Sequence, residues 1–356
     1  MPHTAPAECN FNDPAHGRME LPSLTVDGYS LELHEPGDAE AFIGDRVSRS
    51  AFTAMVDAWR AVYRHMGDDP LGKRSTADMG KKRLDVLLKT REEAARVIEA
   101  AVEDYALQFA DVARRFLRQP SWKGVERIVV GGGFQQSRVG RRAVKRAAAL
   151  LHAAGVKVDL RTLHHHADEG GLIGWLHLVP PDLLRTHDAM LAVDIGGTNL
   201  RCGIVRSRRH KAGDLSKADV VGLTKWAHAA DEDATRREDL VQGLARRLSR
   251  LVSHAEKEGI TLAPCIGVAC PGLICQDGSI AAGAQNLPGN WESTRFHFPS
   301  RLAERIPTIA GAATQVLLHN DAVVQGLSER PFTQDVKRWA VMTVGTGLGN
   351  ASYTNR

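Results

Sequence analysis

The sequence contains no apolar run of the about 18 residues that a membrane-spanning helix needs. Its first residues, MPHTAPAECNFNDPAHGR, also lack the basic segment and apolar core of a secretory signal peptide. We therefore expect a cytoplasmic protein without membrane contact.

Cysteine is scarce, with 5 residues in the chain, an odd number. An odd count does not suit a disulfide framework and favours free, buried thiols in a reducing compartment. Cys265, Cys270 and Cys275 also lack a partnering pair of histidines, so we expect no zinc site there.

The chain has little excess charge of one sign, with a formal net charge of +4. This balance gives no support for nucleic-acid binding. The basic stretch RVGRRAVKR, at 138–146, has no interleaved aromatic residues, so a solvent-exposed helix face is expected. At 356 residues, 43% apolar and 25% charged, the chain can form two lobes, each with its own core.

Apolar periodicity predicts strands that alternate with helices. Spacings of three and four residues predict a helix or helix pair at 81–117 and further helices at 138–155 and 237–258. Short apolar runs predict strands at 127–134, 156–162, 189–194, 201–206, 265–270 and 315–320, and a strand–turn–strand at 338–355. Residues 1–40 are rich in turn formers and weakly periodic. The pattern predicts an α/β protein with mixed sheets.

A glycine turn interrupts the apolar runs just past the middle of the chain, in LAVDIGGTNLRCGIV. Gly196 and Gly197 allow a sharp turn that exposes backbone N–H groups to an anion. Thr198 and Asn199 can donate hydrogen bonds to phosphate oxygens. Asp194, at the end of the apolar run, is placed to hold a hydrated Mg²⁺ through water.

A second glycine turn, Gly345-Thr346-Gly347, lies between two strand-like runs near residue 350. Two such hairpins facing each other could hold a polyphosphate from both sides. The alternative is that each is only a tight hairpin turn, which is a common structure. The spacing GTGLG does not match the GxGxxG fingerprint of a dinucleotide fold.

These motifs resemble those of sugar kinases of the ROK (repressor, open reading frame, kinase) and bacterial glucokinase type, within the actin-like ATPase superfamily. DIGGTN and VGTGLGN are similar to the two phosphate motifs of that family. IGVACPGLICQDGSI, with Gly272, resembles the segment before the sugar site, and AQNLPGNW, with Asn286, the sugar-contacting turn. HNDAVVQGLSE resembles the motif with the catalytic aspartate.

The remaining family motifs lie upstream of the first glycine turn. VERIVVGGGF, with Gly131, Gly132 and Gly133, resembles the late adenosine-binding strand, and HADEGGLIGWLHL resembles the closing helix. The resemblance thus implies a two-lobed actin-like ATPase (ribonuclease H-like) fold with a circularly permuted motif order. Such a permutation is tolerated where the native termini are close together and the new break falls in an exposed loop. Chance similarity upstream, with a truncated end, is the alternative.

The permuted order assigns three segments to two lobes. Residues 1–186 form the adenosine-binding large lobe, 187–317 form the small lobe with the first phosphate turn, and 318–356 return to the large lobe.

The resemblance implies ATP-dependent phosphorylation of a hexose at its 6-hydroxyl, with Mg²⁺ and with Asp321 as general base. A carboxylate with a near-normal pKa suffices for this, because the proton leaves as the hydroxyl attacks. Asn286 and Asn320 are expected to bind sugar hydroxyls. Asn320 and Asp321 are also common helix N-cap residues, and the two roles can coexist.

The family's Glu-x-Gly-His sugar motif has its best match in Asp13 and His16. Asp13 fits a turn before Pro14 equally well. The zinc-binding cysteine cluster that many members carry after this motif is missing here, where only Cys9 lies nearby, so no structural zinc is expected.

The sequence alone leaves two alternative functions. A non-catalytic sugar sensor would use the same fold, although no separate DNA-binding unit is evident. A cytoskeletal or chaperone-like ATPase is disfavoured by the NLPGNW and HNDA motifs. The expected partners are a sugar and a nucleotide, and a homodimer is possible.

Overall fold

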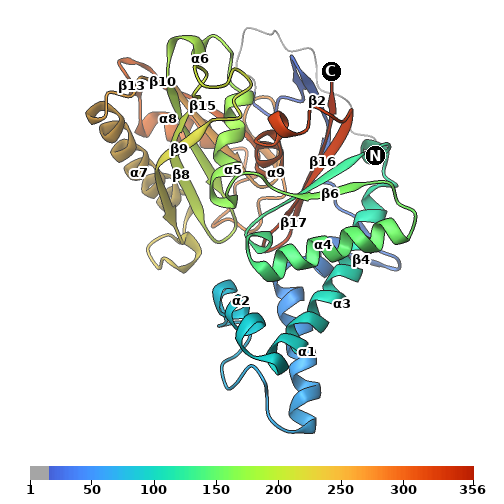
Figure 1. Cartoon of the computed structure of the whole chain (residues 1–356). Helices are drawn as coiled ribbons and strands as arrows, with labels where there is room; N and C mark the ends of the chain where they lie inside the picture. Colours follow the sequence, from blue (N-terminus) through green and yellow to red (C-terminus); the bar gives the residue numbers. More distant parts are fainter. Residues whose placement is uncertain (1–15) are drawn as a thin grey trace. The chain divides into compact units, whose positions relative to one another are not determined.

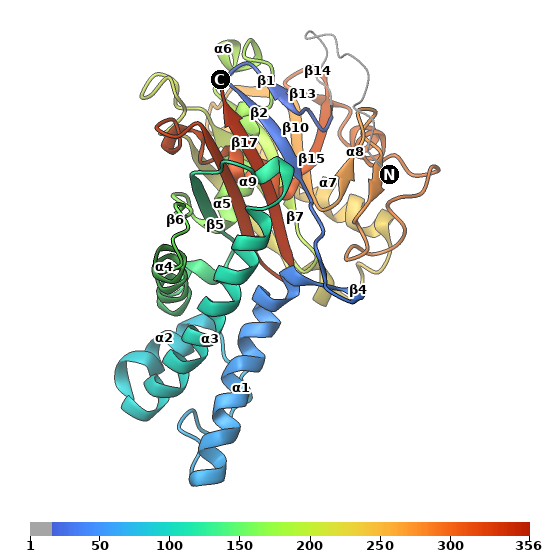
Figure 2. The ribbon, with the colours of Figure 1, turned by 90° about the vertical axis from the view of Figure 1, so that its right-hand side faces the viewer.

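The alternating strands and helices form two units, which we describe separately. The structure is a computed structural model that describes residues 16–356. Unit 1 contains residues 16–26 together with Asp168–Phe332, and unit 2 contains Asp27–Ala167 together with Thr333–Arg356. Figures 1 and 2 show the chain in two views.

A five-stranded sheet in the order β15–β10–β7–β8–β9 forms the centre of unit 1. Antiparallel pairing joins β7 to β8 and β8 to β9, whereas β10 is parallel to both β7 and β15. The bounds are Ala189–Ile195 for β7, Leu200–Arg206 for β8, Asp219–Trp226 for β9, Leu262–Cys270 for β10 and Gln315–Asn320 for β15.

Helices of unit 1 pack against this sheet. The long helix α7 (Arg237–Lys257) buries Leu240, Leu244, Leu248 and Leu251 in one core with β7 and β10, because these residues recur on one helix face. The shorter helices are α5 (Ala167–Ile173), α6 (Leu183–Thr186), α8 (Phe298–Arg305) and α9 (Asp321–Leu327). Short strand pairs complete the unit: β11 (Leu273–Ile274) with β12 (Ile280–Ala282), and β13 (Thr308–Ile309) with β14 (Ala312–Ala313).

The second large sheet has the order β1–β2–β17–β16–β5–β6. Its hairpin β16–β17 is antiparallel, and β5 is parallel to both β16 and β6. The bounds are Glu20–Leu21 for β1, Leu24–Tyr29 for β2, Arg127–Gly131 for β5, Asp159–Thr162 for β6, Arg338–Val344 for β16 and Leu348–Asn355 for β17. A small hairpin, β3 (His34–Glu35) with β4 (Asp38–Phe42), forms a two-stranded sheet of its own.

The helices of unit 2 lie beside this sheet (Figure 2) and share one hydrophobic core with β5 and β16. They are α1 (Arg49–Met66), α2 (Lys81–Thr90), α3 (Glu92–Phe116) and α4 (Arg138–Ala153). Among residues 16–356, no helix combines the length and the hydrophobicity needed to cross a membrane.

The two large sheets have the same arrangement of strands. In unit 1 the hairpin β7–β8 comes first in sequence, β9 lies beyond β8, and the parallel strands β10 and β15 follow beside β7. In unit 2 the hairpin β16–β17 takes the place of β7–β8, with β2 beyond β17 and the parallel strands β5 and β6 beside β16. Here, however, β2, β5 and β6 precede the hairpin in the sequence.

The predicted mixed α/β class is confirmed, and the region 81–117 is a pair of helices. The weakly periodic N-terminal region nevertheless holds β2, and the helix α1 follows it. The three predicted free thiols of the apolar strands, Cys202, Cys265 and Cys270, are buried and unpaired, whereas Cys9 lies outside the described residues.

The compact units divide the chain differently from the predicted lobes. Residues 318–332 group with 187–317 rather than with 333–356, and residues 168–186 also belong to unit 1. The reason is strand pairing: β15 is hydrogen-bonded to β10 from Gln315 opposite Cys265 to Asn320 opposite Cys270. Asp321 therefore lies in the same unit as the first glycine turn.

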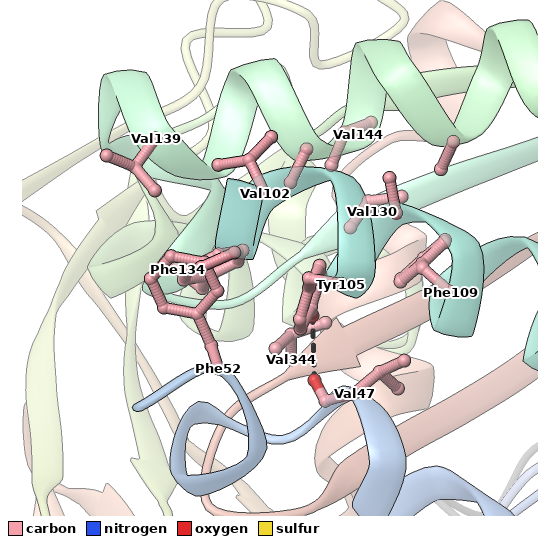
Figure 3. Close-up of a cluster of buried hydrophobic side chains, with 14 of the residues drawn as sticks. Val47, Phe52, Val102, Tyr105, Phe109, Val130, Phe134, Val139, Val144 and Val344 are labelled. Atoms are coloured by element: carbon pink, nitrogen blue, oxygen red, sulfur yellow. Dashed lines mark hydrogen bonds between the residues drawn. The ribbon is translucent and has the colours of Figure 1, made fainter. Parts of the chain in front are cut away.

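An aromatic cluster forms the core of unit 2 (Figure 3). The ring of Phe134 lies 4.9 Å from the rings of both Phe52 and Tyr105, measured between centroids. The buried Tyr105 hydroxyl donates a hydrogen bond of 2.7 Å to the carbonyl oxygen of Val47, which ties α3 to the segment before α1.

We expect Tyr105→Phe to destabilise unit 2 by about 1–3 kcal/mol, because the buried Val47 carbonyl loses a donor while the ring packing stays. Thermal unfolding followed by circular dichroism would measure this loss. Tyr63→Phe is the control, since among the described residues the Tyr63 hydroxyl makes no hydrogen bond. Equal melting temperatures for the two variants would contradict the expectation.

Candidate active site

Three parallel strands of unit 1 end at one edge of the sheet. In register, Asp194 of β7 lies opposite Ala269 of β10, and Ala269 lies opposite His319 of β15. The first glycine turn follows β7, the Pro-Gly turn of Pro271 and Gly272 follows β10, and Asp321 follows β15. Ligands of open α/β sheets bind outside the carboxyl ends of the strands. This edge is therefore the candidate site of unit 1.

The first glycine turn is closed by a hydrogen bond of 2.9 Å from Gly196 N to Asn199 O. A buried imidazole, His228, forms a hydrogen bond of 2.7 Å between its Nε2 and the Gly196 carbonyl oxygen and so stabilises the turn. The backbone of Gly197 lies against Asn286, because a Cβ on Gly197 would be 3.1 Å from Asn286 Cβ. The fold thus brings the predicted phosphate turn and the predicted sugar turn together.

The predicted metal-holding residue Asp194 is paired with an arginine. Arg201 Nη1 lies 3.2 Å from Asp194 Oδ2, and Arg201 also pairs with Asp168. The Lys225 ammonium in turn lies 3.4 Å from Asp168. Burial and the nearby Asp168 raise the pKa of Asp194, although Arg201 opposes this shift.

Helix α5 approaches Asp194 closely at a glycine. A Cβ on Gly171 would lie only 2.9 Å from the carboxylate carbon of Asp194. Neither Gly171 nor Arg201 was predicted as a site residue. The one indication in the sequence is the resemblance of HADEGGLIGWLHL, which contains Gly171, to the closing helix of the family.

Asp321 begins helix α9 directly after β15. Its Oδ1 accepts a hydrogen bond of 2.8 Å from its neighbour Ala322 N, and no described residue donates to its other oxygen. Burial, together with repulsion from Asp194, raises the pKa of Asp321 to about 7. This pKa is higher than the near-normal value that already suffices for a base, because the residue is enclosed next to a second carboxylate.

Asn320 caps the same helix. Its Oδ1 accepts hydrogen bonds from Ala322 N and Val323 N at 3.0 and 3.2 Å, and its Nδ2 donates to Gly272 O at 3.1 Å. The N-cap role considered for Asn320 is therefore present, and the same side chain anchors the Pro-Gly turn. Gly272 has a φ of 104°, and a Cβ there would lie 2.4 Å from Ala282 O.

His16 lies beside the end of β15, because its Nδ1 accepts a hydrogen bond of 3.0 Å from Leu318 N. Its Nε2 faces Gly278, and its ring centroid is 6.4 Å from that of His297. Burial and His297 lower the pKa of His16, so a neutral ring is favoured. The other residue of the predicted sugar motif, Asp13, lies outside the described residues.

Unit 2 brings its own two glycine turns together. They follow the parallel strands β5 and β16, where Gly131 lies opposite Thr343. Gly132 has a φ of 87°, and a Cβ there would be 2.1 Å from Val344 O. The exposed turn of Gly345, Thr346 and Gly347 is closed by Gly345 N donating to Gly347 O at 2.9 Å.

One lysine that the sequence analysis did not select lies at the first of these turns. Lys81, at the start of α2, donates from Nζ to Gly133 O at 2.6 Å. A cation at this position adds positive charge beside exposed backbone N–H groups, a combination that suits a phosphate.

Among residues 16–356, no three His, Cys, Asp or Glu side chains converge as they do in a closed metal site. Mg²⁺ does not need such a set, because it keeps several waters and binds through one or two carboxylates and substrate phosphates. Asp194 and Asp321 are carboxylates of this kind. The donor set therefore fits a hydrated Mg²⁺.

The predicted family is found in the second half of the chain. Residues 190–356 match the ROK family. This ROK segment begins in β7 and includes Asp194, both predicted sugar-binding asparagines, Asp321 and the Gly345–Gly347 turn. No curated protein sequence matches the chain.

Solved structures are similar to about half of the chain at low identity. The ROK family glucokinase from Streptomyces griseus, in complex with glucose and AMPPNP, is 20% identical over 47% of this chain and 46% of that one, with a TM-score of 0.35. Lmo2764 from Listeria monocytogenes, provisionally an N-acetylmannosamine kinase, is 24% identical over 47% of each chain, with a TM-score of 0.32.

An exopolyphosphatase from Cytophaga hutchinsonii is 13% identical over 48% of this chain and 51% of that one, with a TM-score of 0.26. The chain thus spans about half the length of each of these proteins. Because the TM-scores are below 0.5, these similarities carry no weight here.

We expect Arg201→Gln to destabilise the ROK segment by about 3 kcal/mol or less at pH 8 and by a smaller amount at pH 5. Without Arg201 the pKa of Asp194 rises further. The ionised carboxylate then costs stability at high pH, and this cost is lost as protonation neutralises it at low pH. Melting temperatures at both pH values would measure the difference.

The matched control is Arg206→Gln on the same strand. Arg206 pairs with Asp219, which keeps a second partner in Arg208. The loss of stability in Arg206→Gln should be smaller than in Arg201→Gln and should change less with pH. A pH-independent loss in Arg201→Gln would contradict the assigned pairing.

Proposed function

We propose that the protein is an ATP-dependent sugar kinase that phosphorylates a hexose, glucose-like or N-acetylated, at its 6-hydroxyl. The observation that carries this proposal is that two carboxylates, Asp321 and Asp194, lie near each other at the ends of parallel strands. Burial and the charge of Asp194 raise the pKa of Asp321 to about 7. A carboxylate with a pKa near neutrality is suited to general base catalysis. The match of residues 190–356 to the ROK family supports the same function.

In the proposed reaction, Asp321 accepts the proton of the sugar 6-hydroxyl through the oxygen that no described residue occupies. The sugar oxygen forms a bond to the γ-phosphorus of ATP while the bond from that phosphorus to the bridging oxygen of ADP breaks. Asn286, exposed beside Gly197, orients the sugar. Its nearness to the glycine turn supports the required approach of the two substrates.

Asp194 would hold Mg²⁺ through water, and the ion would neutralise the charge of the phosphates. The residues Gly196, Gly197, Thr198 and Asn199 offer N–H and hydroxyl donors to these phosphates. In unit 2, the turns at Gly131–Gly133 and Gly345–Gly347 are the proposed contacts for adenosine and phosphate.

We also propose that the family's halves are circularly permuted in this chain. The strand order supports this, since β2, β5 and β6 occupy in their sheet the places that β9, β10 and β15 occupy in the other. Moved behind the hairpin β16–β17, they would follow the chain order of unit 1.

A coupled ADP-release assay with ATP and Mg²⁺ tests the function across glucose, mannose, N-acetylglucosamine, N-acetylmannosamine and fructose. We expect sugar-dependent turnover with at least one of them. In Asp321→Asn, which keeps the shape but is a far weaker base, turnover should fall about 10²–10⁴-fold while sugar binding by calorimetry stays. Sugar binding without turnover in the unaltered protein would indicate a sensor instead, and ATP turnover indifferent to sugar would indicate another ATPase.

The pH dependence should follow the ionisation of Asp321. A base acts when deprotonated, so kcat/KM should fall about tenfold per pH unit below about 7 and level off above it. Steady-state rates between pH 5.5 and 8.5 would show this limb. A profile that stays flat down to pH 5.5 would refute the role of Asp321 as a base with a raised pKa.

A further inference from the structure

A small cavity of about 310 Å³ lies in unit 1 between β9 and α7, and its lining residue Lys225 is two strands from Asp194 in the register of the sheet. The two elements lie side by side in Figure 1. Its lining includes Thr224 from β9 and Arg247, Arg250 and His254 from α7. Neither the family resemblance nor the proposed reaction uses these residues.

The wall of this cavity on the β9 side contains a glycine, Gly222, at an irregular place in the strand. The register between β8 and β9 shifts between Cys202 and Ile204, which is a β-bulge. Gly222, at this place, has a φ of 63°, and a Cβ on it would lie 2.9 Å from Leu251 Cδ2 and 3.4 Å from His254 Cδ2. Glycine therefore allows the bulge to pack closely against Leu251 and His254 of the helix, at the wall of the cavity.

The cavity is positively charged, and the carboxylate of Asp231 acts on Arg247 only from a distance. In the described part of the chain, neither Arg247 nor Arg250 has a carboxylate within 4.0 Å. Burial, Arg246 and Arg250 lower the pKa of Arg247, which is the effect expected of crowded like charges. Lys225 also lines the cavity, but its charge is offset by the carboxylate of Asp168 at 3.4 Å.

One of the two guanidinium groups is held in place. Arg247 stacks on the indole ring of Trp226, with 4.0 Å from Cζ to the ring centroid, and its Nη1 donates to Gly243 O at 2.9 Å. These contacts use one face and one N–H of the group and leave other donors free. The exposed Arg250 lies one helical turn further along the same face.

We infer that this cavity binds a phosphate group, either as inorganic phosphate or at the end of a small phosphate ester. The guanidinium groups of Arg247 and Arg250 supply bidentate donors, which match phosphate oxygens in geometry and charge. Thr224 adds a hydroxyl and His254 a ring N–H. A volume at the lower end of the range of ligand pockets favours a small ligand.

Isothermal titration of the whole protein with inorganic phosphate, and separately with glucose 6-phosphate, tests this inference. We expect Arg250→Gln to weaken binding about tenfold, since one charge-assisted contact is lost. Arg246→Gln is the matched control, because Arg246 is exposed on the same helix and does not line the cavity. Its binding should stay within about twofold of the original. Equal melting temperatures would show that both variants are folded.

The phosphate turns of the candidate active site could also bind phosphate, and the design separates the two places. Phosphate bound there would persist in Arg250→Gln, so unchanged binding in that variant would overturn the inference. Equal losses in Arg246→Gln and Arg250→Gln would overturn it too, since they would indicate diffuse charge rather than a site. The ligand that binds more tightly identifies the source of the phosphate. The test does not depend on kinase activity.

Discussion

Two carboxylates, Asp194 and Asp321, are held near each other at the ends of parallel strands, and the rest of the site depends on how their charge is balanced. Burial raises the pKa of both groups, with a further rise from Asp168 at Asp194 and from Asp194 at Asp321. Only Asp194 has a guanidinium partner, Arg201, while Asp321 has a backbone N–H. The asymmetry leaves one carboxylate suited to holding a cation and the other suited to accepting a proton.

Close approach of backbone segments makes this arrangement possible. Helix α5 reaches Asp194 only because residue 171 has no side chain, and the first glycine turn reaches Asn286 for the same reason at Gly197. At Gly272 both the positive φ and the nearby Ala282 carbonyl exclude a side chain. The glycines thus act in two ways: some would expose N–H groups to phosphate, and others let polar groups from distant segments converge.

Much of unit 1 was predictable from the sequence, because β7, β10 and β15 are buried strands with continuous apolar runs. Asp194 was selected as the polar end of such a run, whereas Asp321 was selected from the resemblance of HNDAVVQGLSE to a family motif. Arg201 was not, since an arginine in a strand gives no sign of its partner until the register of β7 and β8 is known. The place of 318–332 was missed for the same reason: pairing between strands, not order in the chain, decides which unit a segment joins.

The strand β2 was not predicted from the sequence, and its place in the sheet is informative about the order of the strands. Its six residues alternate weakly and contain a glycine, so periodicity alone does not mark it as a strand. Beyond the hairpin β16–β17, however, it supplies the place that β9 fills in unit 1. A sheet is held by hydrogen bonds between neighbouring strands, and these are the same whichever strand the ribosome makes first. The proposed permutation would therefore change which loops are needed and would leave the sheet itself intact.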